Sequence, residues 1–157
     1  QLNISRTEAS EFIKAYFKKY PSIRDYMDET KKFANENGFV KTLLGRKCLV
    51  EEINSKNAAT RSFMERAAIN APIQGSAADI IKRAMIILGN HKKLAKLETK
   101  MLLQVHDELI FETKKENCEE SMRIIKKEME SANLPILNLN VPLIADTNFG
   151  NNWDEAH

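Results

Sequence analysis

Two short apolar runs lie only three residues apart in the second half of the chain. Residues 101–105 and 109–111 are rich in strand-forming side chains, and His106, Asp107 and Glu108 separate them. So short a polar break allows two strands to pair only as an antiparallel hairpin. The sequence therefore predicts a tight hairpin with two carboxylates at its tip.

Helical patterns precede this hairpin at the start of the chain. Ser5 and Glu8 have the spacing of a capping box, and Pro21 ends the apolar periodicity that follows them. A second capping pattern begins at Ser22, and Gly38 follows the last periodic residue of that segment. We expect two helices here, with broad aromatic faces.

The remaining segments complete an α+β pattern. Residues 39–53 contain short β-like runs on either side of Gly45, residues 116–132 have the periodicity of an amphipathic helix, and residues 141–145 are typical of a strand. Trp153 is expected to anchor the end of the chain. The predicted fold is helix-rich, with an antiparallel β-hairpin and a final strand.

A proline interrupts the long helical pattern in the middle of the chain. Residues 58–71 are rich in Ala, Arg and Glu, but Pro72 would clash with the carbonyl group of Ala68 in a continuous helix. Ser76 and Asp79 have capping-box spacing. The sequence therefore predicts a break before Pro72 and a new helix from Ser76.

Composition excludes several classes of protein. The 157 residues are 43% hydrophobic and 29% charged, which excludes a disordered chain. No apolar stretch reaches the roughly 20 residues needed to span a bilayer, so no membrane partner is expected. Cys48 and Cys118 form no C-x-x-C cluster, which favours a reducing, cytoplasmic location. Because the chain begins with Gln1, we expect it to be a piece of a longer protein.

Charge is distributed unevenly along the chain. Residues 41–96 hold 11 Lys and Arg against 4 Asp and Glu, whereas residues 103–157 hold 5 against 11. A basic region followed by an acidic one is compatible with a polyanion held near metal-binding carboxylates. It is equally compatible with an ordinary solvated surface.

Two groups of residues are candidates for chemistry. Adjacent carboxylates at Asp107 and Glu108 are the kind of ligand that Mg²⁺ prefers, although an exposed polar turn would have the same pattern. Arg66, Asn70 and Gln74 recur every four residues and could donate to the minor-groove acceptors that every base pair presents. Polar residues at a helix–helix junction are the alternative for this second group.

Four segments, in the same order along the chain, resemble the polymerase domain of family A DNA polymerases. The resemblance extends over essentially the whole sequence. Residues 12–27 resemble the segment after the nucleotide-binding finger helix, and residues 70–82 resemble the long palm helix and its lead-in. Residues 104–109 resemble the third catalytic motif, and residues 152–157 resemble the carboxyl terminus of the family.

This resemblance implies template-directed nucleotidyl transfer with two Mg²⁺ ions, on primer-template DNA and deoxynucleoside triphosphates, in replication and repair. It implies a right-hand polymerase in which residues 1–60 are part of the fingers and residues 61–157 part of the palm. Asp107 matches the metal-binding carboxylate, and Glu108 matches a neighbour with a supporting catalytic role. The residues that match DNA-contacting positions are Arg61, Arg66, Asn70, Gln74, His106, Asn54 and Asn57.

Parts of the family pattern are absent from this chain. The second catalytic aspartate, in a motif such as Asp-Tyr-Ser-Gln-Ile-Glu-Leu-Arg, does not occur, and neither does the finger helix that binds the incoming nucleotide. Residues 47–52 depart from the family pattern, which usually has more Arg and a Pro-Asp pair there. We therefore expect this chain alone to be inactive, and to self-associate through the apolar helix faces at residues 12–20 and 26–33.

Two other functions remain open from the sequence. A non-enzymatic duplex-binding module would explain the basic region and the Arg66, Asn70 and Gln74 series without chemistry. A metal-dependent nuclease would need further acids near Asp107, and Asp79 and Asp146 are the candidates.

Overall fold

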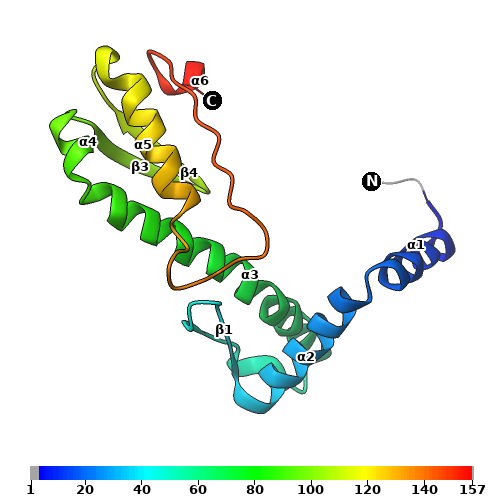
Figure 1. The fold of residues 1–157 in the computed structure, drawn as a ribbon. Coiled ribbons are helices and arrows are strands. Elements are labelled where there is room, and N and C mark those ends of the chain that lie inside the picture. Colours follow the sequence, from blue (N-terminus) through cyan, green and yellow to red (C-terminus); the bar gives the residue numbers. More distant parts are fainter. Residues whose placement is uncertain (1–3, 157) are drawn as a thin grey trace. The chain divides into compact units, whose positions relative to one another are not determined.

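The computed structural model describes residues 4–156, and these residues divide between Ile73 and Gln74 into two compact units (Figure 1). The division between these units falls inside the long helix α3, Ala58–Gly89. The reason is that the first half of α3 packs Met64, Ala68 and Ala71 into the core of the first unit.

The first unit begins with two helices, α1 (Arg6–Lys19) and α2 (Pro21–Asn37). The predicted capping box is confirmed, because the Glu8 amide donates to Ser5 Oγ at 3.2 Å and the Ser5 amide donates to Glu8 Oε2 at 2.8 Å. The predicted cap at Ser22 is wrong. Helix α2 starts one residue earlier, at Pro21, whose fixed φ and missing N–H suit the first helical position.

A small hairpin follows α2. Gly38 ends the helix in the left-handed conformation, with φ 72°, and strands β1 (Phe39–Lys41) and β2 (Lys47–Leu49) pair antiparallel with Val40 opposite Cys48. The short 3-10 helix η1 (Glu51–Asn54) then leads into α3. The predicted hairpin is confirmed, and its buried side joins one core cluster: Ala34, Val40, Val50, Ile53 and Ala68.

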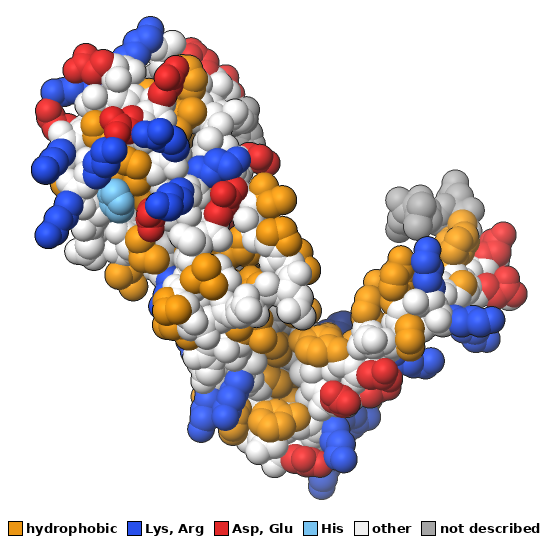
Figure 2. All heavy atoms as spheres, viewed as in Figure 1, with side chains coloured by type: hydrophobic (Ala, Val, Ile, Leu, Met, Phe, Trp, Pro, Cys, Tyr) orange, Lys and Arg blue, Asp and Glu red, His pale blue; other side chains and the backbone are white. Residues whose placement is uncertain are grey.

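Helix α1 contributes nothing to this core. It contains no buried residue, and the side chains of Phe12 and Ile13 are 70% and 57% exposed. Figure 2 shows hydrophobic side chains along α1 on the face in view. The aromatic face that the sequence predicts therefore exists, but within the described residues it is uncovered.

Helix α3 continues through Pro72, so the predicted break and the predicted cap at Ser76 are wrong. Pro72 has no N–H donor and its ring crowds the Ala68 carbonyl, but each flank of the helix is held by a separate hydrophobic core, which offsets this cost. A side chain of helix α2 also contacts this part of α3, because Tyr26 Oη donates to the carbonyl oxygen of Ile69, three residues before Pro72, at 2.8 Å. The packing of α3 in two hydrophobic cores has outweighed the tendency of Pro72 to break the helix.

The second unit places helices against the β-hairpin that the sequence predicts. After α3 come the short helix α4 (Lys92–Lys96), the strands β3 (Lys100–Val105) and β4 (Glu108–Glu112), the 3-10 helix η2 (Lys115–Asn117) and helix α5 (Cys118–Glu130). Helix α5 lies against the hairpin (Figure 1). The core cluster joins the second half of α3, α4 and α5: Ala84, Leu88, Leu94, Ile124, Ile125 and Ala132. Met101, Leu109 and Phe111 of the hairpin pack against it.

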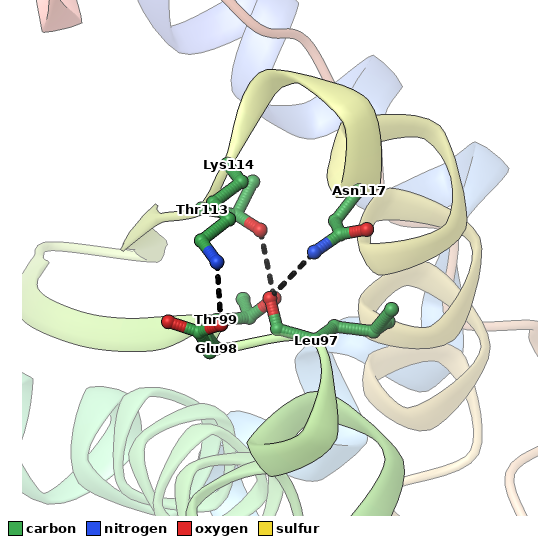
Figure 3. A network of polar contacts seen from close by, with 6 residues as sticks. All are labelled: Leu97, Glu98, Thr99, Thr113, Lys114 and Asn117. Carbon is green, nitrogen blue, oxygen red and sulfur yellow. Dashed lines mark hydrogen bonds and ion pairs between the residues drawn. The ribbon is translucent and has the colours of Figure 1, made fainter.

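Polar contacts hold the base of this hairpin. Thr99 lies directly before β3 and Thr113 directly after β4, and their hydroxyl oxygens are 2.9 Å apart (Figure 3). Asn117 Nδ2 donates to the Leu97 carbonyl. Glu98 and Lys114 form an ion pair that lowers the pKa of the Glu98 carboxyl group. These contacts join the entry to β3 with the exit from β4.

The predicted final strand is absent from the described residues. Residues 141–145 have no ladder partner, Pro142 has no N–H, and the Ala145 amide donates instead to Glu130 Oε1 at 3.2 Å. Helix α6 (Trp153–Ala156) is short, and Trp153 is 48% exposed, so it is not the expected anchor. His157, the last residue of the predicted terminal motif, lies outside the described residues.

Within the described part of the chain, no helix has both the length and the apolar character that crossing a membrane requires. The observed fold is helix-rich, with two small antiparallel sheets.

Candidate catalytic hairpin and nucleic-acid interface

The β3–β4 hairpin closes through a turn of two residues. Val105 pairs with Glu108, which leaves only His106 and Asp107 in the loop. His106 has φ 51°, in the left-handed region, and it shares this property with one other non-glycine residue of the described chain, Glu98. Two-residue hairpin loops need a positive φ at the first loop position, because the backbone twist then matches that of the strands. The turn geometry therefore requires the strained conformation of His106.

The two candidate carboxylates occupy different positions. Asp107 lies in the turn and is exposed, whereas Glu108 is the first residue of β4 and is half-buried. The prediction of two carboxylates at the tip is therefore wrong for Glu108, because the loop closes one residue earlier than the sequence pattern suggested. Of the two carboxylates, only Asp107 lies in the turn, where water solvates its charge and no burial penalty arises.

Asp107 has the chemistry of a magnesium ligand but does not make a complete site within the described residues. No group of three or more His, Cys, Asp and Glu side chains there could hold a metal ion. An exposed carboxylate can supply one oxygen of an octahedral Mg²⁺ shell, in which water and phosphate oxygens usually take several positions. The hairpin tip thus fits a contribution to a metal site whose other ligands come from elsewhere.

The predicted minor-groove residues lie on one helix. Arg66, Asn70 and Gln74 are all exposed and recur at every fourth position of α3. Residues four apart in an α-helix lie on neighbouring parts of one face. Arg66 Nη1 donates to Ser62 Oγ at 2.7 Å, one turn earlier on the same helix. Gln74 is the first residue of the second unit, so the series reaches the division between the units.

The other predicted DNA contacts make hydrogen bonds within the first unit. Asn57 Oδ1 accepts from the amides of Ala59 and Thr60, so this side chain caps the start of α3. Asn54 Nδ2 donates to the Asn35 carbonyl at 2.9 Å, and Arg61 Nη1 donates to the Ser55 carbonyl at 3.0 Å. These residues therefore have structural roles, and their contact with DNA stays a prediction.

Charged groups on the second unit are largely mixed. Figure 2 shows Lys and Arg side chains interspersed with Asp and Glu on the face in view. Lys93 pairs with Glu120, and Lys126 lies 3.7 Å from Glu130. The Lys93 ammonium lowers the pKa of Glu120. Lys93, one of the basic residues of the 41–96 region, is therefore paired with an acid that comes later in the chain.

Sequence reasoning assigned no role to Gln104. Its Nε2 atom donates to the carbonyl oxygen of His106 at 2.8 Å. The signal for this contact was available in the sequence, because a carboxamide two residues before a tight turn can reach the turn backbone. Tyr26 was also missed, and nothing in the sequence links it to the Ile69 carbonyl that it contacts.

Comparisons with known proteins give one consistent result. The sequence model of DNA polymerase family A matches residues 1–155. DNA polymerase I of Rhizobium leguminosarum is 50% identical over 159 residues, which cover 100% of this chain and 16% of that protein. DNA polymerase I of Caldicellulosiruptor bescii is 47% identical over 99% of this chain and 18% of its own length.

A solved structure agrees with the sequence relatives. The polymerase domain of Pol1 from M. smegmatis, in complex with DNA primer-template and dNTP, superimposes with a TM-score of 0.90 and 42% identity. The match covers 99% of this chain and 27% of that one. The chain thus spans under one-fifth of the two curated relatives described above and about a quarter of the solved polymerase domain.

Proposed function

This chain belongs to DNA polymerase family A, and on that basis we propose that the complete protein is a DNA-directed DNA polymerase of replication and repair. The chain supplies part of its polymerase domain, with residues 1–60 in the fingers and residues 61–157 in the palm. The observation that carries the proposal is the position of Asp107: an exposed carboxylate on a two-residue turn between two paired strands.

Asp107 is the metal ligand in this proposal. When bound in the complete enzyme, a pair of Mg²⁺ ions would supply Lewis-acid activation of the primer 3′-hydroxyl and charge stabilisation for the leaving pyrophosphate. Asp107 supplies a carboxylate oxygen from a short hairpin, which restricts the directions in which the side chain can point. Glu108, at the start of β4, supports it from the adjacent backbone position.

Helix α3 contacts the duplex in this proposal. Arg66, Asn70 and Gln74 donate to purine N3 and pyrimidine O2 atoms, which occupy similar positions in every correct base pair. Such contacts test base-pair shape without selecting a sequence. His106 lies next to Asp107 and therefore close to the primer terminus, and Arg61, Asn54 and Asn57 extend the interface around the start of α3.

The isolated chain is expected to be inactive. One carboxylate cannot hold two ions, and the chain spans only 27% of the solved polymerase domain that it resembles. The exposed apolar face of α1 is expected to be covered by other parts of the complete domain, and to cause self-association when they are missing. The thiols of Cys48 and Cys118 are free, which suits a cytoplasmic protein.

A substitution of Asp107 tests the proposal. In the complete protein, Asp107→Ala should lower the rate of primer extension by roughly a thousandfold or more, since a metal ligand is lost. Affinity for primer-template duplex should stay within about twofold, because the carboxylate makes no attractive contact with phosphate. Glu112→Ala is the matched control, an exposed carboxylate at the far end of the same hairpin, and should extend primers at the wild-type rate.

Primer extension by Asp107→Ala at the wild-type rate would contradict the proposal. A wild-type protein that binds duplex in a salt-sensitive manner but incorporates no nucleotide would instead be a non-enzymatic binding module, which the exposed series on α3 also suits. The nuclease alternative would need further acids near Asp107, and a complete protein that cleaves DNA in the presence of Mg²⁺ without extending primers would support it.

The minor-groove contacts have a separate test. Arg66→Ala should lower the rate of extension about tenfold, the effect of losing a charged hydrogen bond. A primer-template with 3-deazaguanine in place of guanine at the contacted position removes the N3 acceptor and should have a similar effect on the wild-type protein. The rate of extension with both changes together should be no lower than with either change alone. Fully additive losses of rate would show that Arg66 does not contact this N3 atom.

A further inference from the structure

The hairpin turn that presents Asp107 is strained at the residue before it. His106 has φ 51°, and for residues other than glycine the left-handed region is unfavourable by about 1–2 kcal/mol. Asparagine and glycine are the usual residues at such positions, and histidine is a less common choice. A contact that favours this turn over relaxed alternatives would therefore keep the hairpin tip in one conformation.

Gln104 makes such a contact. Its Nε2 atom donates to the His106 carbonyl oxygen at 2.8 Å, a normal length for an N–H···O hydrogen bond. Gln104 lies in β3, where it pairs with Leu109, so the donor is carried by the paired part of the hairpin and not by the loop. The strand thus holds the loop through a side chain.

The accepting carbonyl belongs to the peptide bond that joins His106 to Asp107. A peptide group is planar, so the position of the His106 oxygen also determines where the amide nitrogen and Cα of Asp107 lie. A restraint on that oxygen limits rotation about ψ of His106, and the planar peptide passes the restraint on to the position of the Asp107 Cα atom. It therefore limits the region that the Asp107 carboxylate can reach.

We propose that Gln104 is a positioning residue of the polymerase reaction, which orients the Asp107 carboxylate through its hydrogen bond to the His106 carbonyl. This inference rests on the proposed function, because it assumes that Asp107 is the metal ligand. Gln104 need touch neither metal nor nucleotide for this role. Small errors in the placement of a reacting group can lower rates by one or two orders of magnitude.

Two variants of the complete polymerase test the role of the donor. Gln104→Met keeps the length of the side chain and removes both N–H donors, and Gln104→Glu replaces them with an oxygen that repels the carbonyl. Lys100→Met is the matched control, since Lys100 is exposed on the same strand but pairs with Glu112 at the other end of the hairpin.

The first measurement is amide hydrogen exchange in the absence of metal and DNA. Exchange at Asp107 and Glu108 should become about fivefold faster in both Gln104 variants, the effect of losing one ordinary hydrogen bond. Exchange at residues 100–102 should not change. This measurement reports the conformation of the turn and does not depend on catalysis.

The second measurement is primer extension as a function of Mg²⁺ concentration. Both variants should need about fivefold more Mg²⁺ for half-maximal extension, with a maximal rate about five- to tenfold lower. Their affinity for primer-template duplex without divalent ions should match that of the wild type. Lys100→Met should match the wild type in exchange and in Mg²⁺ dependence.

The inference would be overturned if turn exchange or Mg²⁺ dependence were unchanged in the Gln104 variants. It would also be overturned if duplex affinity fell while Mg²⁺ dependence stayed normal, because Gln104 would then contact DNA directly. Asp107→Ala distinguishes this failure from failure of the proposed function. If Asp107→Ala is inactive and the Gln104 variants behave like the wild type, only the positioning role of Gln104 is contradicted. If Asp107→Ala is active, the polymerase assignment is contradicted as well.

Discussion

The two hairpins of this chain reverse direction in different ways. The β1–β2 loop runs from Thr42 to Arg46 and contains Gly45, with φ 85°, and the Thr42 amide donates to the Arg46 carbonyl at 2.9 Å. The β3–β4 turn contains no glycine. It has His106 at φ 51° and Asp107 beside it.

This difference separates a turn whose residues suit folding from a turn whose first residue carries a conformational penalty. At Gly45 the chain has the residue that adopts a positive φ without strain, as folding alone would favour. At His106 the same region of φ is occupied by a residue with a larger intrinsic penalty, next to an exposed carboxylate. Turn residues that are unfavourable for folding, and are held by contacts from a paired strand, are more common where the side chains have chemistry to perform.

Replacing the β3–β4 turn with residues that favour such a turn should have the largest effect on stability and on the rate of primer extension. A complete protein with both His106→Gly and Asp107→Asn carries a Gly-X loop, the sequence preferred where only the first of the two loop residues has a positive φ. Its free energy of unfolding should rise by about 1 kcal/mol, measured by urea denaturation. Its rate of primer extension should fall by roughly a thousandfold or more. A less stable protein would show that this turn is already optimal for folding, and the contrast between the hairpins would then disappear.

Single substitutions at the positive-φ residue in the loop of each hairpin, Gly45 and His106, should have intermediate effects of opposite sign. Gly45→Ala should lower the free energy of unfolding by about 1–2 kcal/mol, because alanine is strained at this positive φ. A Cβ there would meet no atom within 4 Å, so a steric clash would not contribute. His106→Gly should raise it by about 0.5 kcal/mol, because relief of strain exceeds the added entropy of the unfolded chain. Both values can be measured by urea denaturation.

Gly89→Ala is the control for this pair. Gly89 ends α3 without a positive φ and has equally open surroundings, so alanine there should not destabilise the protein. Equal losses at Gly45 and Gly89 would mean that φ is not the cause.

The smallest effect is expected at the base of the second hairpin. Glu98, the other non-glycine residue with a positive φ among the described residues, forms a hydrogen-bonded ion pair with Lys114, which lowers the pKa of its carboxyl group. A lowered carboxyl pKa in the folded state adds stability at neutral pH, and that stability is lost as the pH falls through the folded-state pKa. Wild type and Glu98→Gln should therefore differ slightly in thermal stability at pH 7 and converge below pH 4.5. A difference that persists in acid would point to packing and not to the ion pair.

Local signals were sufficient for many elements. The capping box at Ser5 and Glu8, the left-handed Gly38 and both hairpins depend on contacts within a few residues, so a short stretch of sequence contains all the partners. The same is true of the chemistry of Asp107, since a carboxylate between two apolar runs lies at a turn whatever surrounds it. Ser22 was a poorer guide, because Pro21 directly before it already suits a helix start.

Distant contacts decided the rest. Pro72 should have broken the long helix, but cores in two units and the hydroxyl group of Tyr26 hold α3 on either side of it. Residues 141–145 have the composition of a strand, but a strand needs a partner, and Ala145 bonds to Glu130 instead. Exposure of the α1 aromatic face could not be read from its sequence, which is that of a core helix.

The sequence by itself determined which residues could perform chemistry and which short segments would turn, cap or pair, because these depend on side-chain type and on near neighbours. Only the tertiary structure decided that Pro72 lies within a continuous helix and that residues 141–145 form no strand. Each of these depends on free energy contributed by contacts between paired strands or packed helices, and such contacts do not exist until the chain has folded.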